Sequence, residues 1–145
     1  MKILGIETSC DETAMSVVEV KSEKITVLSN VVSSQVKLHA KYGGVVPSLA
    51  AREHVKNIGH VFELALKQAG LLKSDFNSLD LIAVTRGPGL GPALLVGLTF
   101  AKTIAWLYKK PLVGVSHLEG HIYSNWLSSS RNSKSETLNP KQIQN

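Results

Sequence analysis

The chain has 145 residues, 43% of them hydrophobic and 19% charged, which is enough for one hydrophobic core and excludes a wholly disordered protein. Its single cysteine, Cys10, excludes a disulfide framework and a cysteine zinc site, and it indicates a reducing compartment, the cytosol. Sixteen basic against eleven acidic residues give a net charge of +5, which is compatible with RNA contact but smaller than the excess of an autonomous nucleic-acid-binding protein.

Three apolar runs near the N-terminus predict strands. They are Ile3–Ile6, Met15–Val20 and Ile25–Val32, and the short connections between them are typical of an antiparallel meander. Because the first strand begins at once, we expect no secretory or transit segment before it. The stretch Gln35–Pro47, with its pair of glycines, is expected to be a loop.

A long amphipathic helix is predicted next. Ser48 is expected to cap its N-terminus and Gly70 to end it. Apolar side chains recur at helical spacing between these two residues, with charged residues off that stripe, which predicts one buried face. The predicted buried face consists of Val55, Ile58, Phe62, Ala65, Leu66 and Ala69.

Strands and helices alternate in the following segment. Leu79–Val84 and Pro111–Val115 predict two strands, and Ala93–Tyr108 predicts a helix that is apolar nearly all round and therefore buried on most sides. His117–Leu127 predicts a third helix. Alternating strands and helices after a meander favour a ribonuclease H-like α/β lobe, with a mixed five-stranded sheet flanked by helices. No stretch reaches the ~20 apolar residues of a membrane-spanning helix.

The end of the chain differs in composition. Residues 1–127 are expected to form the lobe, whereas Ser128–Asn145 is polar and serine-rich, without apolar periodicity. Such a segment cannot bury enough surface to offset the entropy lost on ordering. We therefore expect it to be a disordered tail or a linker.

Two histidines four residues apart begin the last predicted helix. On a helix, His117 and His121 share one face, so both imidazoles can reach the same divalent ion. The order is H-x-E-x-H and not the H-E-x-x-H of zinc proteases. Glu119 therefore points away from the helix face that the two histidines share and does not face a metal-bound water. Two ligands do not close a metal site, so two ordinary hydrogen-bonded histidines explain the pattern as well. Asp11 and Glu12 are the candidates for a further ligand within the chain.

Two loops are further candidates. In Arg86–Pro92, glycines allow a ligand to approach the backbone and a helix N-terminus favours an anion, but a tight strand–helix turn explains the same residues. The turn Glu7–Thr13 can direct hydroxyl groups to phosphate oxygens and carboxylates to a metal ion, or it can be a solvated hairpin turn. Cys10 in this turn has no evident neighbouring base and is expected to be an ordinary loop residue.

Other side chains capable of chemistry receive no functional role. His39, His54 and His60 fall in loop or helix contexts. Trp106 and Trp126 are expected to be packing residues, since no cluster of aromatic residues accompanies them to form a base-stacking surface.

Five segments occur together in one order: Ile3–Thr13, Gly43–Pro47, Arg52–His54, Gly87–Leu90 and His117–His121. In this combination they resemble the TsaD family of tRNA N6-adenosine threonylcarbamoyltransferases, and its bacterial branch in particular. The match runs from residue 1 to about 127 without large gaps, and several motifs at once are far more specific than any one alone.

This resemblance implies a two-lobed, actin/hexokinase-like (ASKHA) enzyme. It moves a threonylcarbamoyl group from threonylcarbamoyl-adenylate to N6 of an adenosine beside the anticodon. His117 and His121 match two ligands of the family's metal, for which Fe²⁺ is favoured and Zn²⁺ is the alternative. Asp11 and Glu12 match acidic positions of the first loop and are expected to be catalytic, orienting water, metal or the attacking amine. Residues expected near the substrate or its phosphate are Thr8, Ser9, Gly87 and Gly89.

The resemblance also implies partners and an incomplete site. The partners are tRNA, threonylcarbamoyl-adenylate, a TsaB-like paralogue and a TsaE-like ATPase, in the cytoplasm and without a membrane. Family members are more than twice as long, and their C-terminal lobe supplies the remaining metal aspartate and most substrate-binding glycines, which are missing here. A cleft with one wall cannot desolvate its site, so we expect this chain alone to have little or no activity.

Two other functions fit part of this pattern. A non-catalytic scaffold paralogue of the same complex has a similar N-terminal lobe but lacks the histidine pair, so the pair argues against it. A metalloprotease conflicts with the position of Glu119.

Overall fold

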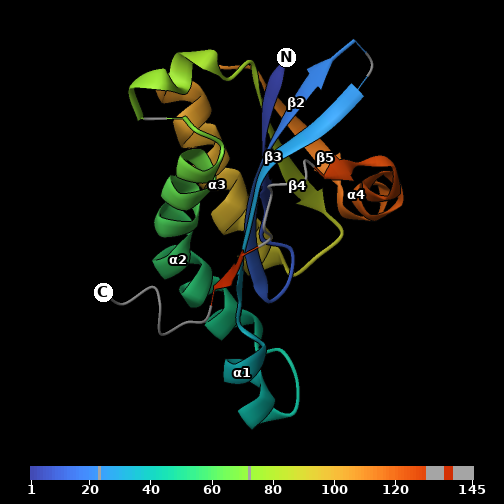
Figure 1. The fold of residues 1–145 in the computed structure, drawn as a ribbon. Helices are drawn as coiled ribbons and strands as arrows, with labels where there is room; N and C mark the ends of the chain where they lie inside the picture. Colours follow the sequence, from blue (N-terminus) through green and yellow to red (C-terminus); the bar gives the residue numbers. More distant parts are fainter. Residues whose placement is uncertain (23, 72, 130–135, 139–145) are drawn as a thin grey trace.

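A mixed β-sheet with helices on both faces forms the body of the protein (Figure 1). The computed structural model describes residues 1–22, 24–71, 73–129 and 136–138. Helices α2 and α3 cover one face of the sheet, and α4 lies on the other (Figure 1). The described strands follow the order β5-β4-β1-β2-β3-β6, with β7 also paired to β3. The five longer strands are those expected from the sequence, which confirms the α/β class.

The first three strands form the predicted antiparallel meander. They are β1 (Lys2–Glu7), β2 (Glu12–Lys21) and β3 (Lys24–Ser34). β2 pairs with β1 on one side and with β3 on the other. Since both pairings are antiparallel, β1 and β3 run in the same direction.

Two further strands extend the sheet beyond β1. β4 (Leu81–Gly87) is parallel to β1, and β5 (Leu112–Ser116) is parallel to β4. The chain reaches β4 through α2 (Pro47–Gln68) and η2 (Lys73–Ser78), and reaches β5 through α3 (Gly91–Leu107). The carboxyl ends of β1, β3, β4 and β5 therefore meet at one edge, which is where open α/β sheets bind their ligands.

The hydrophobic core lies between the sheet and helices α2 and α3. Strand side chains alternate between the two faces, and one set, which includes Leu4 and Ile82, is buried beneath these helices. Phe62 contacts Phe76 and Phe100, with ring centroids 5.8 and 5.4 Å apart. These contacts fix α2 and α3 over the centre of the sheet.

The ends of α2 differ from the prediction at one terminus. Val46 is the N-cap and Pro47 lies in the first turn, where the fixed φ of proline suits a helix, so the prediction of Ser48 as the cap is wrong. At the other end Ala69 is the C-cap and Gly70 has a φ of +71°. This left-handed residue ends the helix as predicted.

The buried face of α2 is rotated relative to the predicted one. Ile58, Ala65 and Leu66 are buried as expected, but Val55 is 63% exposed. The adjacent His54 is fully buried instead. Periodicity counts apolar residues only, and it therefore missed a histidine whose polar atoms all find partners.

Helix α3 is buried on one side only, contrary to the prediction. Its small residues Gly97 and Ala101 pack inward, whereas Leu95 is exposed and Trp106 is 81% exposed. In the described part of the chain no element covers this outer face. Trp126 is exposed as well, so the expectation that both tryptophans pack inside is wrong.

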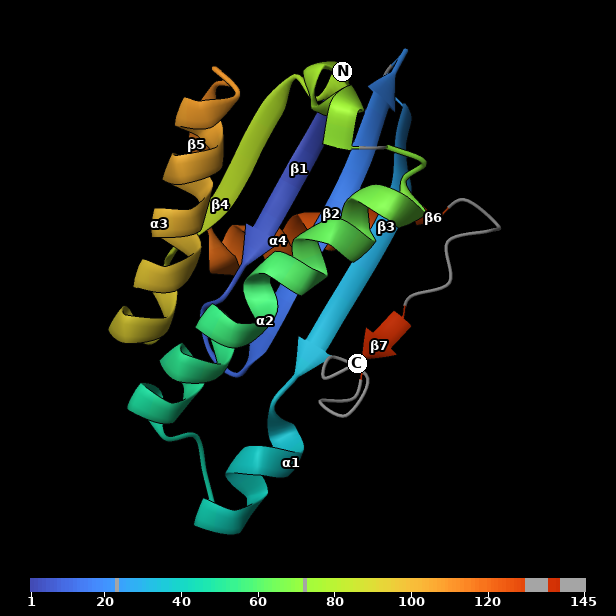
Figure 2. The same cartoon turned by 90° about the vertical axis from the view of Figure 1, so that its left-hand side faces the viewer.

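The segment predicted as a loop contains two short helices. α1 (Val36–His39) is followed by the 3-10 helix η1 (Ala40–Tyr42), and Gly43, with a φ of +71°, ends it. Elements this short are not revealed by periodicity. Both helices project beyond the end of the sheet (Figures 1 and 2).

The C-terminal elements are short. α4 (His117–Tyr123) and η3 (Ser124–Trp126) occupy the region predicted as one helix. β6 (Ser128–Ser129) and β7 (Glu136–Leu138) run parallel to β3. The predicted tail otherwise falls on residues 130–135 and 139–145, outside the described residues. Among the helices that are described, none has the length and apolar character needed to cross a membrane.

The packing of α3 on the end of β1 can be tested with one glycine. A Cβ at Gly97 would lie 2.3 Å from Oγ1 of Thr8, a buried hydroxyl that donates to the carbonyl of Ala93 at 2.9 Å. Gly97→Ala is therefore expected to lower the free energy of unfolding by about 1–3 kcal/mol in urea denaturation. Gly59→Ala is the control, because nothing lies within 4 Å of its added Cβ, and it is expected to stabilise α2 by about 0.5–1 kcal/mol. Equal stabilities of the two variants would contradict this packing.

Candidate functional site

Three neighbouring strands bring polar side chains to their common edge. Glu7 ends β1, Thr85 lies near the end of β4, and His117 directly follows β5. These strands are parallel and adjacent, so their carboxyl ends meet. Side-chain alternation places Glu7 and Thr85 on the face opposite the core, where α4 lies.

The carboxylate of Glu7 is the centre of the contacts at this edge. Its Oε2 accepts a hydrogen bond from Oγ1 of Thr85 at 2.6 Å and lies 3.0 Å from Nδ1 of His117, while Oε1 accepts the backbone N–H of Ser9. Burial raises the pKa of Glu7, but the hydrogen bonds from Thr85, His117 and Ser9 outweigh it and hold the pKa below its ordinary value. Glu7 is therefore ionised at neutral pH.

The ionised Glu7 selects one tautomer of His117. A carboxylate can only accept, so Nδ1 of His117 carries the proton and Nε2 of the neutral ring keeps its lone pair. Oγ of Ser9 lies 3.2 Å from the same Nδ1. On the next turn of α4, Nε2 of His121 lies 3.0 Å from Nε2 of His117, with the rings at 88° to one another.

This pair of nitrogens fits two ligands of one divalent ion. Imidazole nitrogens about 2.1 Å from a shared ion stand about 3.0 Å apart as adjacent octahedral ligands and about 3.4 Å apart as tetrahedral ligands. A carboxylate on the opposite ring nitrogen, as Glu7 provides for His117, is the usual support of a metal-bound histidine. Within the described residues no three His, Cys, Asp or Glu side chains are grouped to hold an ion. Further ligands would have to come from solvent, substrate or another part of the protein.

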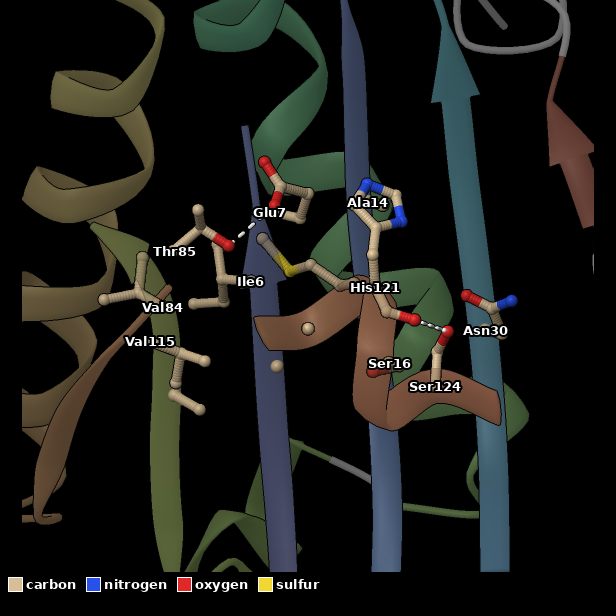
Figure 3. A pocket seen from close by; sticks show the side chains of 14 residues that line it. Ile6, Glu7, Ala14, Ser16, Asn30, Val84, Thr85, Val115, His121 and Ser124 are labelled. Atoms are coloured by element: carbon tan, nitrogen blue, oxygen red, sulfur yellow. Dashed lines mark hydrogen bonds between the residues drawn. The ribbon is translucent and has the colours of Figure 1, made fainter. Parts of the chain in front are cut away.

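A pocket of about 420 Å³ lies between this edge of the sheet and α4. Figure 3 shows Glu7 and Thr85, joined by their hydrogen bond, and His121 on α4 around the same hollow. Most of the other lining residues are glycine or apolar, among them Gly5 and Ala83. A few polar groups at one part of an otherwise apolar hollow are typical of a small-molecule site.

Ser9 and Gly89, both predicted to lie near the substrate, pack against each other at this site. The carbonyl of Ser9 accepts the N–H of Leu90 at 2.7 Å, and a Cβ at Gly89 would lie 2.7 Å from that carbonyl oxygen. Glycine is therefore required for the close approach of the loop. Gly87 pairs with Ser116 and has a φ of +144°, which favours glycine. Contact of these residues with a substrate stays a prediction.

Thr8, Asp11 and Glu12 are not brought to the histidine pair by any contact that the structure describes. Thr8 is buried under α3, Glu12 is exposed at the start of β2, and the backbone carbonyl of Asp11 accepts the N–H of Gln35 at 2.9 Å. The roles predicted for them stay predictions. Glu7 was included in the predicted turn Glu7–Thr13 but received no role of its own. Its position at the end of a buried strand, directly before a polar turn, was the sequence feature that could have indicated one.

Cys10 in the same turn has the chemistry of an ordinary thiol. Desolvation, followed by the hydrogen bond and negative charge of Asp11, raises its pKa. A raised pKa disfavours the nucleophilic thiolate. This agrees with the expectation that Cys10 is not a nucleophile.

A buried histidine ties the first turn to α2. Nε2 of His54 lies 3.0 Å from the carbonyl of Cys10 and must donate to it, so Nδ1 is an acceptor. Nδ1 receives the hydroxyl of Thr13 at 2.7 Å and the side-chain amide of Gln35 at 3.4 Å. Burial lowers the pKa of His54, and the ring is therefore neutral at neutral pH.

A second histidine extends this network into α1. Nδ1 of His39 accepts the N–H of Val46 at 3.3 Å, so its Nε2 donates to Oε1 of Gln35 at 3.0 Å. The amide of Gln35 also donates to the carbonyl of Ala50. His39 and His54, to which the sequence assigned no role, thus join α1 and α2 to the turn that carries Ser9.

Comparison with known proteins identifies the family. Residues 26–136 match the TsaD family, described as tRNA N6-adenosine threonylcarbamoyltransferase. A protein of that name from Thermomicrobium roseum is 59% identical over 128 residues, and one from Thermosipho melanesiensis is 56% identical over 128 residues. The chain belongs to the TsaD family. These alignments cover 88% of this chain but only 33% and 37% of the relatives, so the chain spans about a third of their length.

Solved structures share the fold of this TsaD-family chain. YeaZ from Pseudomonas aeruginosa has a TM-score of 0.57 at 18% identity, covering 86% of this chain and 48% of that one. RuvC from T. thermophilus, in complex with Holliday junction substrate, has a TM-score of 0.52 at 18% identity, covering 86% of this chain and 72% of that one. At this identity the likeness shows the fold alone, and it confirms the predicted ribonuclease H-like lobe.

The neutral state of His54 predicts how stability depends on pH. Its pKa is lowered in the folded protein relative to about 6.5 in the unfolded chain, so the unfolded state binds more protons as the pH falls below about 6.5. The contribution of His54 to stability is complete above that pH and declines below it. Urea denaturation from pH 8 to pH 5 is expected to show a steeper loss of stability for the wild type than for His54→Gln. Parallel curves for the two proteins would contradict the neutral assignment.

Proposed function

We propose that this chain is the N-terminal lobe of an enzyme that transfers a threonylcarbamoyl group from threonylcarbamoyl-adenylate to N6 of an adenosine beside the anticodon of tRNA. The observation that carries the proposal is the row formed by Glu7, His117 and His121 at the carboxyl ends of β1 and β5. Membership of the TsaD family supports it.

A divalent ion, Fe²⁺ before Zn²⁺, would be held by Nε2 of His117 and of His121. Bound there it would polarise a carbamoyl or phosphate oxygen as a Lewis acid. Glu7 holds the proton on Nδ1 of His117 and thereby keeps Nε2 free as a ligand. Asp11 and Glu12 remain the proposed groups that orient the attacking amine, since they follow Ser9 in the same turn.

The lobe by itself is proposed to be incomplete. The chain spans about a third of its relatives, and the described residues supply two imidazole ligands, of which His121 also lines the pocket. A second lobe would close the cleft and exclude water, which transfer to a weakly nucleophilic amine requires. A TsaB-like paralogue and a TsaE-like ATPase are the proposed protein partners. The scaffold alternative is disfavoured, because the chain carries the histidine pair that the scaffold paralogue lacks, and identity to the transferases reaches 59%.

Metal binding tests the role of the histidine pair. Calorimetric titration of the chain with Zn²⁺ at neutral pH is expected to show one ion bound per chain. His117→Ala and His121→Ala should each weaken binding at least about 10-fold, and Glu7→Gln by about 10- to 100-fold. His60→Ala, on α2 and away from the pair, is the matched control and should bind as the wild type does. Unchanged affinity in both variants of the pair would refute the ligand assignment.

A transfer assay tests the incompleteness of the lobe. With threonylcarbamoyl-adenylate and unmodified tRNA, the 145-residue chain is expected to give no measurable modified adenosine, because one wall cannot desolvate the reaction. A full-length relative in the same assay serves as the positive control. Normal turnover by the chain alone would show that no second lobe is needed.

A further inference from the structure

A short arm projects from the sheet edge that carries the candidate site. We define the arm as residues 36–46, which contain α1, η1 and the turn at Gly43. The arm continues from β3, and β3 ends at the same edge as β1, β4 and β5. Figures 1 and 2 show the arm extending past the end of the sheet, away from its body.

The surface of the arm is basic and carries an exposed aromatic ring. From residue 24 to residue 52 the sequence has three lysines and one arginine and no aspartate or glutamate. On the arm itself Lys37 and Lys41 are exposed. Tyr42, next to Lys41, is 63% exposed. An exposed cation and an exposed aromatic ring therefore occupy consecutive positions of a projecting element.

The arm is held in place by buried polar contacts at both of its ends. At its start the N–H of Gln35 donates to the carbonyl of Asp11 at 2.9 Å. At its end the N–H of Val46 donates to His39, whose other ring nitrogen donates to Gln35. Gln35 and His39 are both buried. A fixed arm loses little conformational entropy when it binds a ligand.

The same contacts connect the arm to the candidate site. Gln35 reaches His54, and His54 donates to the carbonyl of Cys10, the residue after Ser9. Ser9 in turn contacts His117. The arm and the histidine pair are thus attached to the two sides of one turn.

We infer that the arm binds the RNA substrate, with Lys41 at a backbone phosphate and Tyr42 stacked on an unpaired base of the anticodon arm. Stacking on an exposed aromatic ring beside a cation is the usual way to hold single-stranded nucleic acid. A protein partner fits less well, because lysine is depleted at protein–protein interfaces and the arm carries no acidic residue to complement a basic one. The inference rests on the proposed function, since that function makes RNA the substrate.

The test measures the affinity of the 145-residue chain for an unmodified anticodon stem–loop RNA by fluorescence anisotropy at several salt concentrations. Lys41→Ala is expected to reduce the slope of log affinity against log salt by about 0.7–0.9, which corresponds to one lost phosphate contact. Tyr42→Ala is expected to weaken binding by about 5- to 150-fold with little change in slope, and Tyr42→Phe to restore it. Far-ultraviolet circular dichroism confirms that each variant is folded.

Matched controls lie on α3. Lys102→Ala removes an exposed lysine and Trp106→Ala an exposed aromatic ring near the C-terminal end of that helix, away from the edge that carries the arm. Both should bind RNA as the wild type does.

The inference is overturned if the chain does not bind the RNA, if the arm variants bind as tightly as the wild type, or if the control variants weaken binding equally. Unaltered RNA affinity in the arm variants would instead favour a protein as the ligand of the arm. Because the readout is RNA affinity, it can fail while the metal titration of the histidine pair succeeds, and the two proposals are tested separately.

Discussion

The carboxylate of Glu7 is the contact on which the site depends. It receives a hydroxyl from β4, a backbone N–H from the first turn and a ring N–H from α4, and thus joins three segments that are remote in sequence. These hydrogen bonds keep it ionised, and its negative charge fixes the tautomer of His117. Without this acceptor, Nδ1 of His117 would keep only its contact with the hydroxyl of Ser9 at 3.2 Å.

Much of the fold could be predicted because hydrophobic periodicity and strand–helix alternation are local signals. The meander, the two parallel strands and the three longer helical regions all appear in the predicted order. The errors have local causes as well. α1 is too short to show a period, Pro47 displaced Ser48 at the start of α2, and the outer face of α3 is apolar although nothing described covers it.

The candidate site was only partly predictable. The spacing of His117 and His121 on one helix face is a sequence property, and the structure brings their Nε2 atoms to 3.0 Å. The partnership of Glu7 with His117 depends on the order of β1, β4 and β5 in the sheet, which no local pattern encodes. The same holds for His54, whose three partners come from the first turn, β2 and the start of α1.

The order of the strands also constrains how the lobe assembles. In the sheet, one edge of β1 pairs with β4. This edge is exposed to solvent until the segments that form β2, β3, α2 and then β4 have been synthesised. Parallel pairings of this sequence separation close slowly, and an uncovered strand edge invites pairing with other chains. In a nascent chain the antiparallel hairpins would therefore form early. The two histidines would be positioned last, once β5 had paired with β4. During that interval the open edges of β1 and β3 can pair with other chains.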